Sequence, residues 1–153
     1  MKKVILLSAL ILALSASLYA KEKKAAIGIG LEWNMNAREN FAGGAVFSFD
    51  YNLPRAFALG VNVTASSNFS GITVIEPAAF LRWYFLGGYN GFFIQADLGV
   101  YLILEDEDLT PMFLGGFRGG FRFPLGNSFY VEPFGRIGYP FAFGIGALAG
   151  IKF

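Results

Sequence analysis

The 153-residue sequence contains neither cysteine nor histidine. Without cysteine there is no disulfide framework, no thiol chemistry and no site for lipoprotein acylation. Without histidine the chain lacks the commonest general base and metal ligand. The serines beyond residue 20 also have no base at a recognisable spacing. These serines are Ser48, Ser66, Ser67, Ser70 and Ser128. We therefore predict no enzyme, cofactor or metal site, although a hydrolase that uses the carboxylates of Asp97 and Glu132 stays open at this point.

Charged residues and long apolar runs are both scarce. Only 15% of the residues are charged and 55% are hydrophobic, with a mean hydropathy of +0.51, which is too apolar for an ordinary soluble domain. No apolar run reaches the roughly 20 residues of a membrane-spanning helix. The length allows one domain, and the 20 glycines and 18 phenylalanines favour strands over helices.

The N-terminus has the pattern of a secretory signal peptide. Lys2 and Lys3 precede an apolar segment at 4–14 and the sequence SASLYA at 15–20. We predict a cleavable signal peptide over residues 1–20 and one domain over 21–153, with the cleavage site open by a few residues because Leu18 is not small. Removing the two lysines from the 12 basic residues leaves 10 against 11 acidic residues. This balance gives no electrostatic reason to expect a nucleic-acid partner.

The rest of the chain alternates between large apolar residues and small or polar ones. In one segment, for example, Phe57 and Leu59 alternate with Ala58 and Gly60. The segments that alternate in this way are 26–33, 41–51, 57–65, 73–85, 92–104, 113–123, 129–139 and 142–153. Their lengths are close to the 9–11 residues or so that a tilted membrane-spanning strand needs.

The chemistry of the two faces predicts the architecture. One face is continuously large and aromatic, whereas the other carries glycine, alanine and isolated charges. A soluble barrel of the lipocalin kind would need the large face inside, but a barrel of this size has no room for it. In lipid, only a closed barrel leaves no strand edge unpaired. We predict an all-β, eight-stranded antiparallel up-and-down transmembrane β-barrel.

The predicted connections are short. Turn residues occur at 52–55, 86–91 and 124–128, and the loops at the other end are 36–39, 66–71, 105–110 and 139–142. The acidic run at 105–108 does not match a calcium-binding loop and is predicted to be a solvated hairpin tip. Pro77 and Pro133 fall inside predicted strands, where we expect bulges or rim positions. Aromatic residues near strand ends are expected to form membrane-interface rings. They are Trp33, Phe41, Tyr51, Trp83, Phe85, Phe129 and Tyr139.

Most charges fall on the small-residue face, which we predict to line the lumen, the interior of the barrel. They are Glu32, Asp50, Arg82, Asp97, Arg118, Arg122, Glu132, Arg136 and Lys152. Buried charges persist when they are paired, and neighbouring strands supply the natural partners. We predict Asp97 opposite Arg118, Arg122 diagonal to Glu132 and Arg82 diagonal to Asp97. This explains the arginines in FLGGFRGGFRF (113–123) better than an RNA-binding segment does. Two functions remain for the network, a structural plug or a gated path for protons or small ions.

The C-terminal sequence FGIGALAGIKF ends on phenylalanine with an apolar residue at every second position before it. Together with the eight segments, it resembles the small eight-stranded outer-membrane barrels, such as the outer membrane protein A transmembrane domain, OmpX, OmpW and the opacity proteins. The resemblance implies an assembly signal at Phe143, Ile145, Ile151 and Phe153, and recognition by the outer-membrane assembly machinery. We predict a monomer in the outer membrane of a Gram-negative-type bacterium, surrounded by lipid, with a mainly structural role. The alternative is a narrow channel for small polar solutes, or OmpW-like passage of small hydrophobic molecules.

Overall fold

The computed structural model describes residues 23–35, 41–69, 71–86, 88–105 and 108–153. The predicted signal peptide and the loop at 36–39 lie outside these residues, as does part of the acidic run at 105–108. Within the described ranges, no helix is long and apolar enough to cross a membrane.

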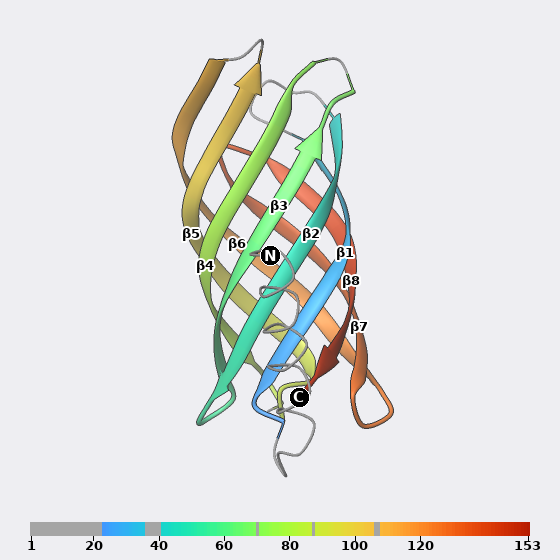
Figure 1. The fold of residues 1–153 in the computed structure, drawn as a ribbon. Coiled ribbons are helices and arrows are strands. Elements are labelled where there is room, and N and C mark those ends of the chain that lie inside the picture. Colours follow the sequence, from blue (N-terminus) through green and yellow to red (C-terminus); the bar gives the residue numbers. More distant parts are fainter. Residues whose placement is uncertain (1–22, 36–40, 70, 87, 106–107) are drawn as a thin grey trace, which may run out of the picture.

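Eight antiparallel strands form one closed barrel, in which each strand pairs with its neighbours in sequence and β1 pairs with β8 (Figure 1). The strands are β1 (Ala25–Met35), β2 (Phe41–Leu53), β3 (Phe57–Ser67), β4 (Thr73–Tyr84), β5 (Gly91–Glu105), β6 (Asp108–Leu125), β7 (Phe129–Tyr139) and β8 (Phe143–Lys152). Backbone hydrogen bonds of 2.8 and 3.0 Å between Ala25 and Phe153 place the start of β1 and the C-terminus at the same end. The predicted eight-stranded antiparallel barrel is confirmed.

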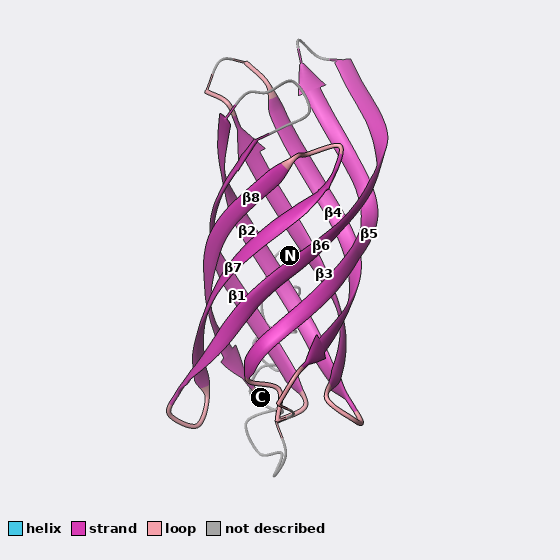
Figure 2. Ribbon diagram, turned by 180° about the vertical axis from the view of Figure 1, so that it is seen from behind, coloured by secondary structure: helices cyan, strands magenta, loops and turns pink. Residues whose placement is uncertain are grey.

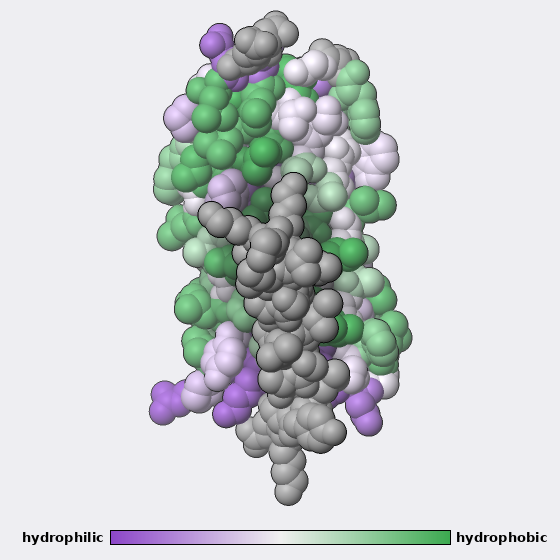
Figure 3. Space-filling model, in the orientation of Figure 1, coloured by the Kyte–Doolittle hydropathy of each residue, from purple (hydrophilic) through white to green (hydrophobic). Residues whose placement is uncertain are grey.

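The alternation of the sequence sets which side chains point outward. In β3, Phe57, Leu59 and Val61 are exposed, whereas Ala58 and Gly60 are buried. The same alternation covers most of the outer wall with large apolar side chains, and on the face shown in Figure 3 the most hydrophilic surface residues lie at the two ends. All seven aromatic residues predicted for the interface rings are exposed. The face with the large apolar side chains therefore points outward, as predicted.

The hairpin between β5 and β6 is tighter than predicted. Its ladder continues to the pair of Glu105 and Asp108, so β6 begins at Asp108 and not at residue 113. On its other edge, the pairing of β6 with β7 starts only at Gly115 and Tyr139. The β5–β6 hairpin consequently extends further than the β7–β8 hairpin (Figure 2). The predicted loop over 105–110 is wrong because Leu109 and Thr110 continue the strand.

Pro77 in β4 and Pro133 in β7 interrupt the ladder without shifting it. Pairing of β4 with β5 is missing between the pairs Ile75–Leu102 and Ala78–Gly99, on either side of Pro77. The register is the same before and after the gap, and the pairing of β6 with β7 is interrupted in the same way at Pro133. Proline has no N–H to donate to the neighbouring strand. The predicted bulges are therefore wrong, and so are rim positions, since each proline lies inside its strand.

Candidate functional site: the charged lumen

Two arginines and two carboxylates form a buried cluster towards the end of the barrel that carries the β2–β3, β4–β5 and β6–β7 turns. Arg82 on β4 donates two hydrogen bonds of 2.9 Å to the carboxylate of Glu132 on β7. Arg122 on β6 donates from Nε to the same carboxylate at 2.6 Å, and from Nη2 to Asp50 Oδ2 on β2 at 2.7 Å. All four side chains are at most 1% exposed. Such a network is stable only because each charge has an opposite charge in contact.

These ion pairs join walls that face each other across the lumen. In a closed ring of eight strands, β2 lies four strands away from β6, so the Asp50–Arg122 pair crosses the full width of the barrel. The Arg82–Glu132 pair links β4 to β7, three strands away. The side chains of this cluster therefore reach across the interior from wall to wall.

A second cluster is centred on Arg136 of β7. Its guanidinium donates to Glu76 of β4 at 2.7 and 3.2 Å, and its Nε donates to Glu32 Oε1 of β1 at 2.8 Å. The side-chain amide of Asn34 also donates to Glu32 at 2.9 Å. Like the first cluster, this one bridges opposite walls, from β4 to β7.

Glu76 belongs to this cluster but is absent from the residues predicted for the lumen. The signal was present in the sequence, because Glu76 lies six residues before Arg82 and an even spacing in a strand means the same face. Lys152, which we did predict, is only partly buried. Its ammonium donates to Asn90 at 2.9 Å at the end of the barrel and takes no part in either cluster.

Asp97 and Arg118 do not form the predicted opposed pair. Asp97 is opposite Gly116, and Arg118 is opposite Gln95. Asp97 instead accepts hydrogen bonds from Asn62 at 2.6 Å and Gln95 at 2.7 Å. In the described part of the chain, Arg118 has no ion pair within 4.0 Å, and its buried Nε and Nη1 have no hydrogen-bond partner.

The other predicted pairs were partly right. Arg122 does pair with Glu132, through a direct hydrogen bond. Arg82 is diagonal to Asp97, because it lies opposite Gln95, but its charge partner is Glu132 on the far wall. Pairing between adjacent strands therefore explains only part of the network.

Aromatic rings pack against the luminal arginines. Each luminal arginine has its guanidinium carbon within 4.0–4.3 Å of a ring centroid, as expected for a cation–π contact. The contacts are Arg82 with Phe93, Arg118 with Phe134, Arg122 with Tyr130 and Arg136 with Phe141. Glycines on the luminal face leave room for these rings: a Cβ on Gly146 would lie 2.6 Å from Cζ of Phe134.

The residues predicted to form the assembly signal lie on β8 and directly after it. Phe143 and Ile145 point outward and are 42% and 62% exposed, while Ile151 and Phe153 are partly buried beside β1. In the ranges described, no three acidic side chains gather in a way that could hold a metal ion.

Comparison with known proteins identifies the fold but no close relative. No protein-family model and no curated protein matches the chain. Among solved structures, it is similar to Neisserial surface protein A (NspA), with a TM-score of 0.63 and 11% identity over 84% of this chain and 96% of that one. It is also similar to the N-terminal β-barrel domain of Pseudomonas aeruginosa OprF, with a TM-score of 0.65 and 12% identity over 86% and 98%. A de novo designed barrel, TMB2.3, matches with a TM-score of 0.52 and 13% identity over 88% and 98%. At this level of identity, the comparisons bear on architecture alone, and the architecture is that of the small eight-stranded outer-membrane β-barrels.

Proposed function

We propose that the chain is an integral outer-membrane protein whose lumen is plugged and whose role in the cell envelope is structural, without catalysis. We further propose that it is exported by its N-terminal segment, inserted by the outer-membrane assembly machinery through its C-terminal strand, and monomeric in the membrane. The exposed apolar wall supports the membrane setting, because only lipid covers such a surface favourably.

The observation that carries the proposed plug is the set of ion pairs that cross the lumen at two positions. Asp50 with Arg122, and Glu76 with Arg136, each connect strands on opposite sides of the barrel. Opening a passage there would separate charges that are buried and in direct contact, which is costly in a low-dielectric interior. Rings stacked on the same guanidinium groups add further side-chain volume to the lumen, which also supports the proposed plug.

We expect the protein to resist extraction from membranes by carbonate and to migrate differently on a denaturing gel before and after heating. Both follow from a closed barrel, because lipid holds the wall and its ladder has no free edge to open. A sample unfolded in urea before loading is the control, and its migration should not depend on heating. Release of the native chain by carbonate would contradict the membrane setting and favour a soluble barrel.

The plug predicts that the purified barrel shows no discrete conductance steps in a planar lipid bilayer. The matched variants are Arg118→Gln inside the lumen and Arg55→Gln at the exposed turn after β2. Neither should introduce steps, because both ion-pair clusters stay in place. Discrete steps in the unaltered protein would overturn the plug.

One observation favours the second candidate, a gated path for small ions. Arg118 is a fully buried guanidinium with unsatisfied donors, so a change in its position breaks no ion pair among the described residues. On this alternative, the conductance of the unaltered protein changes in the Arg118→Gln variant and not in Arg55→Gln. Sideways passage of hydrophobic molecules has less support, because the ladder closes around the ring and, between Gly115 and the turns, is interrupted only beside Pro77 and Pro133.

A further inference from the structure

The outer wall has a gap in its cover of side chains between β5 and β8. Four residues, paired from strand to strand, form one outward-facing row across these strands: Ile94, Gly119, Gly135 and Ile145. Because the two central members are glycines, two neighbouring strands present bare backbone at this level. Strands lie about 4.8 Å apart, so the gap is wide enough for a hydrocarbon chain.

The glycines of this row are not required by packing inside the barrel. A Cβ on Gly119 would meet no atom nearer than 3.9 Å, and one on Gly135 none nearer than 3.8 Å. A Cβ on the luminal Gly120, in contrast, would lie only 2.5 Å from the backbone oxygen of Pro133. Gly115 also faces outward, but there the ring of Phe113 covers the backbone, and a Cβ would lie 3.0 Å from its Cε1 atom. The bare backbone at Gly119 and Gly135 is thus an open place in the wall.

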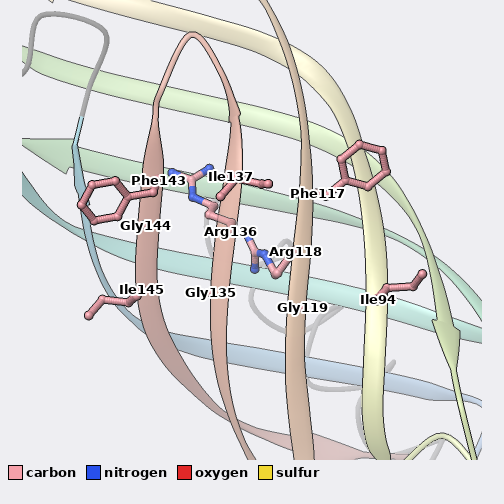
Figure 4. Close-up of a pocket in the computed structure, with 10 residues that line it drawn as sticks. All are labelled: Ile94, Phe117, Arg118, Gly119, Gly135, Arg136, Ile137, Phe143, Gly144 and Ile145. Atoms are coloured by element: carbon pink, nitrogen blue, oxygen red, sulfur yellow. The ribbon is translucent and has the colours of Figure 1, made fainter.

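Apolar side chains enclose this place as a groove of about 530 Å³. Phe117, Ile137 and Phe143 form the next row, and they frame the two glycines together with the isoleucines of the first row (Figure 4). These side chains are 42–64% exposed and belong to the apolar belt that covers the barrel. The groove is therefore continuous with the surface that lipid covers.

We propose that this groove, named here the Gly119–Gly135 groove, holds an acyl chain of a membrane lipid. The inference rests on the proposed membrane setting, in which hydrocarbon chains are the medium around the wall. A chain in the groove gains contacts with the backbone and with side chains on both sides, which a chain on the convex wall between such grooves lacks. A second copy of the barrel fits less well, since two convex walls meet along a strip too narrow for the roughly 1,000 Å² of a stable interface.

The test uses the refolded barrel in phosphatidylcholine vesicles that contain a phosphatidylcholine with a photoactivatable acyl chain. After illumination, the cross-linked peptides are identified by mass spectrometry. We expect peptides that contain Phe117, Gly119, Gly135 or Ile145 to be labelled about threefold more than outward-facing segments that line no groove, a modest excess because packing contacts in lipid are individually small. The variant Gly119→Leu/Gly135→Leu fills the groove and should remove the excess.

The matched control is Ala79→Leu, which also adds a leucine to the outer wall but lies on β4, away from the groove. It should leave the excess labelling unchanged. Two results would overturn the inference without affecting the membrane setting. One is uniform labelling of the whole wall, and the other is excess labelling that persists in the Gly119→Leu/Gly135→Leu variant. Cross-linked dimers of the chain in place of lipid adducts at the groove would also overturn it, in favour of a second copy. No labelling anywhere on the wall, with no heat-dependent migration, would instead reject the membrane setting itself.

Discussion

Replacing Glu132 by alanine is expected to lower the free energy of unfolding by about 3–5 kcal/mol. Glu132 is in contact with both Arg82 and Arg122, and all three side chains are buried. Without it, Arg82 still donates to Gln95 and Tyr84, but the one carboxylate left within 4.0 Å among the described residues is Asp50 at 3.9 Å, which Arg122 already shares. An arginine cannot shed its proton to relieve the excess charge. The loss is a large part of the roughly 5–15 kcal/mol that stabilises a typical domain.

The measurement is reversible urea unfolding in lipid vesicles, with Asp97→Ala as the matched control. Asp97 is also a buried carboxylate of the lumen, but its close contacts are with the amides of Asn62 and Gln95, not with an arginine. Its removal should cost about 1–3 kcal/mol, the range for leaving buried donors unpaired. Equal losses for the two variants would mean that Glu132 contributes as a hydrogen-bond acceptor and that its charge matters little.

The positions of the strands and the direction of each face could be predicted from the sequence because both depend on local geometry. Successive side chains of a strand point to opposite sides, so alternation alone places Arg82 inside and Trp83 outside. This also explains why an error in the predicted register of β5 and β6 did not change which face each side chain was assigned to. The predicted pairing of Asp97 with Arg118 differs from the observed pairing of Asp97 with Gly116 by two residues. A shift of two keeps every side chain on its face, whereas a shift of one would have reversed them all.

The contacts that fill the lumen could not be predicted in the same way. The partners in the Asp50–Arg122 pair are 72 residues apart in sequence and come from strands that are not neighbours. Which residues meet across a barrel depends on the tilt and stagger of all eight strands together. Glu76 is a different case, because its even spacing from Arg82 places both residues on the same face of β4. The sequence therefore held the signal, but Pro77 beside Glu76 interrupts the alternating pattern.

Gly30→Ala should be the most disruptive small substitution, with a loss of about 3 kcal/mol or more in unfolding free energy. Gly30 lies on β1 opposite Leu148 of β8, at the seam where the first and last strands close the barrel. A Cβ at this position would lie 1.9 Å from the backbone oxygen of Ala147, and a backbone atom cannot turn aside as a side-chain tip can. The two strands must therefore move apart. In lipid, no water is available to satisfy the hydrogen bonds broken at such a seam.

Gly135→Ala is the control, because it makes the same change at an outward position where the nearest atom is 3.8 Å from the added carbon. There we expect a change of less than about 1 kcal/mol, since the methyl group meets only lipid and restricts the unfolded chain slightly. Urea unfolding in vesicles and the folded fraction on unheated gels would measure both variants. If Gly30→Ala were as stable as Gly135→Ala, β1 and β8 would have to adjust their spacing freely. The close approach of β1 and β8 at Gly30 would then not be needed to close the barrel.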